Sequence, residues 1–202
     1  MNQNLTEIIF LLDRSGSMSG LEDDTIGGFN GFLNTQCKLG QTLLTTVLFD
    51  DRYEILHNGV DASKVILTEK EYFTRGSTAL LDAVGKTILD VGFRLSHLPE
   101  EGRPGKVIFV ITTDGLENAS KEFSYEKVNQ MISDQRERYQ WEFIFMGANI
   151  DVAKESHKLG ISPELAFRYE ASDAGTDRMY RQVSHMVSEM RIPDTFRNKK
   201  KH

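Results

Sequence analysis

Oxygen-bearing side chains alternate along the chain directly after its first strongly apolar run. The run IIFLL (residues 8–12) ends at Asp13, and Ser15 and Ser17 follow at alternate positions, with Gly16 between them. A curved loop can aim three such side chains at one point, and a glycine relieves crowding of the backbone there. A carboxylate with hydroxyls offers only hard oxygen donors, which suit Mg²⁺, Mn²⁺ or Ca²⁺ rather than Zn²⁺ or Cu²⁺. This stretch therefore indicates a site for a divalent cation.

Two further groups of oxygen-bearing residues lie at the ends of other apolar segments. RGSTALLD (75–82) places Thr78 just before a helical pattern, and VITTDGLEN (110–118) places Asp114 at the end of an apolar run. An alternating Asp, Ser and Ser is a weak motif by itself. Three such groups at element ends make a stronger prediction.

The elements that must position these groups alternate between strand and helix. Near-continuous apolar runs predict parallel central strands at residues 8–13, 43–50, 106–114 and 141–147. Residues 52–58 alternate in polarity after a tight turn, which predicts an antiparallel edge strand, and 164–170 predicts a last strand. Apolar residues at helical spacing predict four helices, around residues 26–37, 80–95, 128–132 and 179–190.

Alternating strands and helices predict an α/β fold with a mostly parallel sheet and helices on both faces. In such sheets, ligands bind beyond the carboxyl ends of the strands. Asp13 and Asp114 each end a predicted strand, so both carboxylates should emerge at the same edge. The divalent-cation site is expected at that edge.

This arrangement resembles the von Willebrand factor type A (vWA) domain and its metal-ion-dependent adhesion site. The resemblance assigns Asp13, Ser15, Ser17, Thr78 and Asp114 to that site. It implies a three-layer Rossmann-like fold, direct ligation by the three hydroxyls, and aspartates that act mainly through water. It also implies a protein partner whose Glu or Asp carboxylate completes the shell. The chain looks most similar to small stand-alone bacterial members found near tellurite-resistance and stress operons.

Mg²⁺ or Mn²⁺ is the expected cation, and Ca²⁺ is less favoured, because a rigid six-fold oxygen shell that keeps exchangeable waters suits Mg²⁺. Neutral hydroxyl ligands leave more positive charge on the cation, which favours an incoming carboxylate. Arg14, Gly16 and Met18 are expected to shape the rim of the site.

Composition sets the wider expectations. A length of 202 residues fits one domain at residues 1–194, followed by a basic, disordered tail at 195–202. The net charge of −6 disfavours nucleic acid as a partner, and the apolar runs are too short to cross a membrane. Glu7 interrupts any secretory signal, and Cys37 is the single cysteine, so a cytoplasmic location is expected. The expected oligomeric state is a monomer or weak homodimer.

An enzyme is the alternative prediction, as a Mg²⁺-dependent phosphoryl-transfer or phosphatase-type protein. Aspartate-based phosphatases need a second acid two residues after the first, and Ser15 occupies that position. Gly85-Lys86-Thr87 resembles the end of a P-loop, but Leu80 stands where its first glycine is required. Met18 stands where a nucleophile elbow needs serine. No catalytic residue is therefore predicted.

Two further acidic or polar groups lie near the expected site. Asp23 and Asp24 suit the first turn of a helix, where they interact favourably with the helix dipole, so no second cation is assigned to them. The stretch GANID (147–151) has two open interpretations. It either lines the rim of the metal site or forms a turn in which Asn149 or Asp151 caps a helix.

Overall fold

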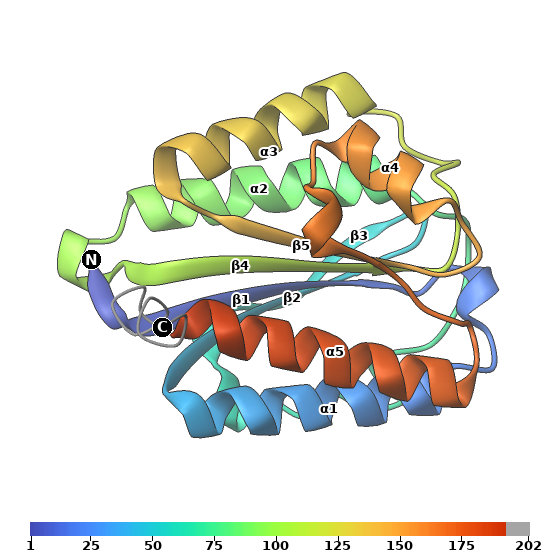
Figure 1. The fold of residues 1–202 in the computed structure, drawn as a ribbon, viewed down its shortest axis with the longest axis horizontal. Coiled ribbons are helices and arrows are strands. Elements are labelled where there is room, and N and C mark those ends of the chain that lie inside the picture. Colours follow the sequence, from blue (N-terminus) through green and yellow to red (C-terminus); the bar gives the residue numbers. More distant parts are fainter. Residues whose placement is uncertain (193–202) are drawn as a thin grey trace, which may run out of the picture.

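A computed structural model describes residues 1–192, so the predicted tail at 195–202 lies outside the described residues. Six strands form one sheet in the order β3-β2-β1-β4-β5-β6 (Figure 1). The strands are β1 (Asn2–Asp13), β2 (Gln41–Phe49), β3 (Tyr53–Asp61), β4 (Pro104–Thr113), β5 (Glu142–Gly147) and β6 (Ala166–Arg168). All neighbouring pairs are parallel except β2 and β3, which confirms the antiparallel edge strand.

Helices cover both faces of the sheet, as the alternating pattern predicted. The helices are α1 (Glu22–Leu39), α2 (Leu80–Ser96), α3 (Tyr125–Tyr139), α4 (Val152–Leu159) and α5 (Asp173–Arg191). Figure 1 shows α2, α3 and α4 on one face and α1 with α5 on the other. Within residues 1–192, no helix has both the length and the apolar character needed to cross a membrane.

The central strand β1 separates two hydrophobic cores. Ile9 and Leu11 belong to the core beneath α2 and α3, whereas Ile8, Phe10 and Leu12 belong to the core beneath α1 and α5. All five side chains are fully buried, because successive residues of a strand point to opposite faces and both faces are covered. The buried strands hold the carboxyl edge of the sheet in a fixed position.

Some boundaries differ from the predicted ones. β1 begins at Asn2 rather than at residue 8, because the polar residues at its start pair with β4 at one position and with β2 from Leu5 onward. The last strand is limited to Ala166–Arg168, and α4 was not predicted. An eight-residue helix spans too few turns for a clear periodicity.

Candidate metal centre

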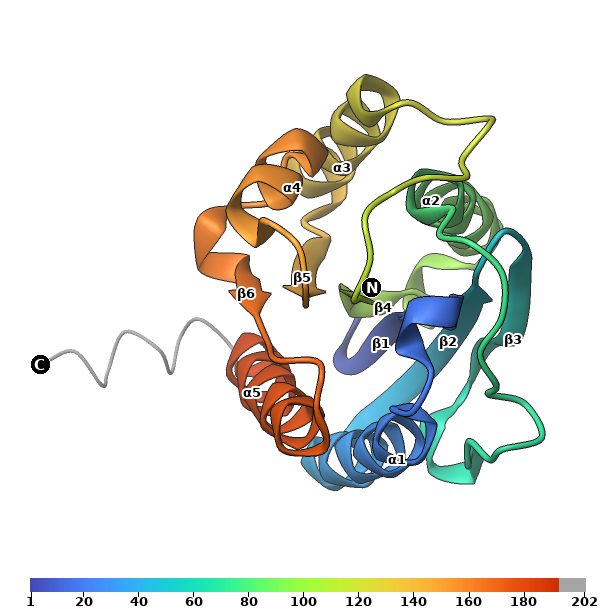
Figure 2. The same ribbon diagram turned by 90° about the vertical axis from the view of Figure 1, so that its right-hand side faces the viewer.

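The three groups of oxygen-bearing residues meet at the carboxyl edge of β1 and β4. Figure 2 looks onto this edge, and the short turn η1 (Gly16–Met18) lies in front of the strand ends. β1 and β4 pair in parallel register, with Leu12 opposite Thr112. Asp13 therefore ends its strand beside the last residue of β4.

Asp13 is fully buried and held by hydrogen bonds on both carboxylate oxygens. The backbone N–H of Ser15 donates to Oδ1 at 2.7 Å, and the hydroxyl of Thr113 donates to Oδ2 at 2.6 Å. The hydroxyl of Tyr72 donates to the backbone carbonyl of Asp13 at 2.7 Å. The side chain thus has one fixed orientation.

Ser15, Ser17 and Asp114 form a continuous chain of contacts beside it. The two serine Oγ atoms lie 3.1 Å apart, and Ser17 donates to Oδ1 of Asp114 at 2.5 Å. The second carboxylate oxygen of Asp114, Oδ2, is buried and has no hydrogen-bond partner among the described residues. An unpartnered buried carboxylate oxygen is costly, so this atom is available to a ligand or to ordered water.

Thr78 reaches the same point from the loop before α2. A Cβ added to Gly115 would lie 3.2 Å from Oγ1 of Thr78 and 3.3 Å from Oγ of Ser17, so both hydroxyls face one position beside Gly115. The Thr78 backbone is fixed by Asn118, whose Oδ1 accepts from the N–H of Thr78 at 2.9 Å. The structure therefore brings together all five residues that the sequence singled out.

Burial raises the pKa of both carboxylates of the site. Burial raises the pKa of Asp13 to about 6; hydrogen bonds from Thr113 and Ser15 oppose the rise, and the nearby charge of Asp114 adds to it. Burial also raises the pKa of Asp114, against the hydrogen bond from Ser17. In the described part of the chain, no lysine or arginine forms an ion pair with either group. The site therefore concentrates negative charge that a cation would neutralise.

The donor set fits a hard divalent cation. Two carboxylates and three hydroxyls supply only oxygen, and the unpartnered Oδ2 of Asp114 shows unused acceptor capacity. Over residues 1–192, no group of three or more His, Cys, Asp or Glu side chains is placed to hold a metal ion. A cation bound here would thus depend on the serine and threonine hydroxyls to complete its shell.

The expected rim was wrong for Arg14. This side chain is only 1 % exposed, and its Nε donates to Asp50 at 3.0 Å while a terminal nitrogen donates to Glu54 at 2.8 Å. Asp50 is fully buried directly after β2, and the nearby guanidinium of Arg14 stabilises its negative charge. Met18 is also buried, near the hydroxyl of Tyr169, so of the three expected rim residues only Gly16 is exposed.

The two interpretations of residues 147–151 are settled in part. Asp151 caps α4 by accepting from the N–H of Lys154 at 3.1 Å, which confirms the cap. Asn149 is exposed, adopts the left-handed conformation with φ 55°, and lines a pocket beside the candidate metal centre. Asp23 and Asp24 lie in the first turn of α1, as expected.

Two residues that support the centre were missed in the sequence. Thr113 orients Asp13, and Asn118 fixes the backbone of Thr78. Thr113 directly precedes Asp114 at the end of a predicted strand, so its position in the sequence could have indicated that it lies beside the site. Asn118 lies in a loop whose path no local pattern specifies.

Comparisons with known proteins identify the fold. No protein-family model matches this chain, and no curated protein matches it. Similar solved structures include proximal thread matrix protein 1 from the mussel byssus, with a TM-score of 0.65 and 17% identity over 93% of this chain and 47% of that chain. Manganese-loaded TRAP protein from Plasmodium vivax has a TM-score of 0.63 and 17% identity over 89% of this chain and 73% of that chain. The pilus adhesin SpaC from Lactobacillus rhamnosus GG has a TM-score of 0.65 and 13% identity over 93% of this chain and 30% of that chain.

These likenesses, at low identity, concern the fold. With a mostly parallel six-stranded sheet, one antiparallel edge strand and helices on both faces, this chain has a vWA-like Rossmann fold. The chain spans about half the length of the mussel protein.

Proposed function

We propose that this protein is a divalent-cation-dependent protein-binding module of the adhesion type. Asp13, Ser15, Ser17, Thr78 and Asp114 would hold one Mg²⁺ or Mn²⁺ ion. A Glu or Asp side chain of a partner protein would complete the shell.

A single observation carries this proposal: two buried carboxylates lie beside three converging hydroxyls with no cationic side chain paired to either carboxylate within residues 1–192. Elsewhere in the molecule the fully buried Asp50 is paired with two arginines. Buried carboxylates without such pairing destabilise a fold unless hydrogen bonds or a ligand compensate, and the raised pKa values of Asp13 and Asp114 show that their hydrogen bonds do not compensate fully. The energetic cost at Asp13 and Asp114 is what a bound cation would remove.

The hydroxyls and the carboxylates would have different roles in holding the ion. Ser15, Ser17 and Thr78 are neutral donors, so they bind without cancelling positive charge. Asp13 and Asp114 would hold the water shell, and they fix the loop by accepting hydrogen bonds from Ser15 and Ser17. When bound, the cation supplies a Lewis-acidic centre that accepts an anionic oxygen from the partner.

The comparisons support this proposal through the shared fold. One similar structure is a manganese-loaded TRAP protein, and another is a pilus adhesin. Binding is also favoured over catalysis by Ser15, which occupies the position of the second acid of aspartate-based phosphatases. Its hydroxyl lies against Ser17 and it is only 2 % exposed.

Calorimetric titration with Mg²⁺ and with Mn²⁺ tests the metal site. The wild type should bind one ion, whereas Asp13→Asn and Thr78→Ala should lose binding and keep the circular dichroism spectrum of a folded sheet. Asp23→Asn is the matched control, since it removes an exposed carboxylate from the first turn of α1. If Asp13→Asn bound metal with wild-type affinity, the assignment would fail.

A screen of phosphate esters with Mg²⁺ tests the enzyme alternative. No turnover is expected. Turnover that Asp13→Asn abolishes and Asp23→Asn retains would replace the binding function with a catalytic one.

A further inference from the structure

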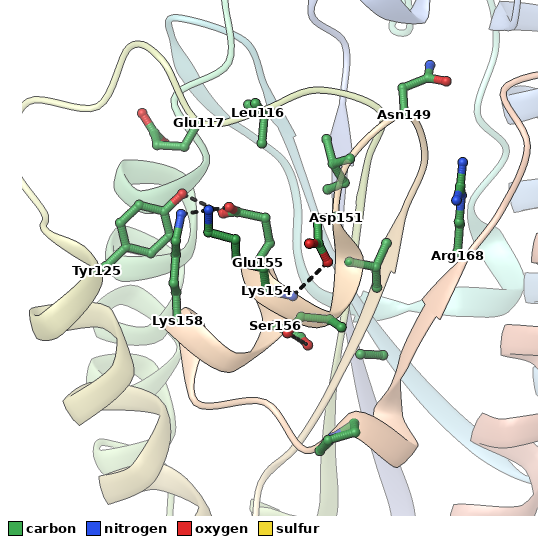
Figure 3. Close-up of a pocket in the computed structure, with 15 residues that line it drawn as sticks. Leu116, Glu117, Tyr125, Asn149, Asp151, Lys154, Glu155, Ser156, Lys158 and Arg168 are labelled. Carbon is green, nitrogen blue, oxygen red and sulfur yellow. Dashed lines mark hydrogen bonds and ion pairs between the residues drawn. The ribbon is translucent and has the colours of Figure 1, made fainter.

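A large pocket adjoins the candidate metal centre on the same edge of the sheet. Its volume is about 1080 Å³, and Figure 3 shows it between the loop after β4, the start of α4 and β6. Leu116 and Glu117, which line it, begin two residues after Asp114. Two residues span at most about 7 Å of backbone, so the pocket begins within that distance of the metal centre.

The negative charges of the pocket are already engaged within the protein. Glu117 accepts hydrogen bonds from backbone N–H groups of the loop after β4 and the start of α2. Asp151 caps α4. Glu155 is 3 % exposed, accepts from the hydroxyl of Tyr125 at 2.6 Å and pairs with Lys158 at 2.7 Å.

Two positive charges of the pocket are not engaged. Lys154 and Arg168 are both exposed, and neither forms an ion pair with any described residue. Figure 3 shows Arg168 across the pocket from the loop that carries Leu116 and Glu117. Lys154 and Arg168 are therefore free to pair with an acidic ligand, and they lie beside a centre built to accept a carboxylate.

The remaining lining is largely apolar. Leu116 is 55% exposed although it is a large aliphatic side chain, and Ile150, Val152, Pro163 and Ala166 contribute to the walls. A ligand that suits this pocket combines apolar surface with negative charge.

We propose that the pocket binds a segment of the same partner chain whose carboxylate completes the metal centre, and that this segment carries an apolar side chain and a second acidic residue. This inference rests on the proposed function. An extended peptide advances about 3.3 Å per residue, so a residue about two positions from the metal-binding one reaches the start of the pocket, and the second acidic residue should lie at or just beyond that position. Lys154 and Arg168 would select it by charge.

A random peptide library displayed on phage and selected in Mg²⁺ provides the test. Peptides released by EDTA are sequenced, and their affinities are measured for the wild type and for Lys154→Glu/Arg168→Glu. Lys38→Glu/Lys127→Glu is the matched control, because it makes the same change in net charge at exposed positions outside the pocket. Both altered pocket residues are exposed, so the fold should persist.

Support for the inference would be EDTA-released peptides that carry paired acidic residues at this spacing and bind Lys154→Glu/Arg168→Glu about tenfold more weakly, with the control unchanged. EDTA-released peptides that bind the pocket variant as tightly as the wild type would overturn the inference and leave the proposed function intact. The inference is also overturned, with the proposed function intact, if the pocket substitutions leave the peptide affinities unchanged while inorganic phosphate shifts the amide signals of residues 150–154. The pocket then holds a small anion. If EDTA releases no peptide, both the proposed function and this inference fail.

Discussion

The Thr113 hydroxyl donates a hydrogen bond of 2.6 Å to Oδ2 of Asp13, although the two residues are 100 positions apart in the sequence. The same hydroxyl lies 3.1 Å from the carbonyl of Gly115, to which it can also donate. Thr113 can therefore accept a hydrogen bond from an asparagine amide at position 13 while it donates to Gly115. An isosteric change at position 13 should leave the local structure intact.

Asp13→Asn should stabilise the metal-free protein while it abolishes cation binding. Burial raises the pKa of folded Asp13 to about 6 from its ordinary 3.8, so ionised Asp13 destabilises the fold above pH 6. That difference corresponds to about 3 kcal/mol at neutral pH. Urea denaturation with a chelator should show a higher free energy of unfolding for the variant at neutral pH, and a smaller difference near pH 4, below the folded pKa. A variant less stable than the wild type at neutral pH would contradict this account.

Cation affinity should fall as the pH drops through the folded pKa of Asp13. Protonation of Asp13 removes a negative charge that attracts the cation, so the affinity for Mn²⁺ should decrease by up to about tenfold per pH unit below pH 6. Calorimetry at several pH values measures this. Thr113→Val should move the decline to higher pH, because the hydrogen bond from Thr113 lowers the pKa of Asp13. An affinity that is constant down to about pH 5 would count against a role for the Asp13 charge in holding the cation.

Gly115→Ala should weaken cation binding with little effect on stability. The new Cβ would lie 3.2 Å from Oγ1 of Thr78 and 3.3 Å from Oγ of Ser17, which is close enough to displace both hydroxyls slightly. Gly115 does not adopt a positive φ, so alanine suits its backbone. Displaced ligands should cost at least about tenfold in affinity. Gly102→Ala is the control, because its Cβ would meet only Pro99, at 3.6 Å or more; unchanged affinity in Gly115→Ala would show that the hydroxyls are not ligands.

Arg14→Met should destabilise the fold far more than Arg75→Met. Both arginines pair with the fully buried Asp50, but Arg14 is 1% exposed and Arg75 is 34% exposed. Removing the buried partner should cost about 3–5 kcal/mol, and removing the exposed one about 1 kcal/mol. Thermal and urea unfolding measure both changes. Equal losses in the free energy of unfolding would contradict this prediction, because they would show that both arginines stabilise Asp50 to the same extent.

The sequence predicted the sheet, its antiparallel edge and the convergence of the site, because these follow from strong local signals. Runs such as residues 8–13 are apolar throughout, and parallel strands present their carboxyl ends at one edge. Asp13 and Asp114 were therefore placed correctly without knowledge of side-chain geometry.

Arg14, Thr113 and the pocket depended on contacts that no local pattern encodes. Arg14 was expected at the rim of the site, yet Asp50 holds it in the interior from 36 positions away. The role of Thr113 depends on the register between β1 and β4. The pocket depends on α4, a helix too short to be recognised by periodicity.

The alternation of β1 between the two cores has a further consequence. Ile8, Phe10 and Leu12 face one layer of helices, Ile9 and Leu11 face the other, and Asp13 continues the same alternation. Deleting one residue within this strand would exchange the side chains that β1 contributes to the two cores and turn the carboxylate away from Thr113 in a single step. The register of β1 therefore determines both the packing of the cores and the orientation of Asp13. Evolution cannot shift this register by a single residue without disrupting both.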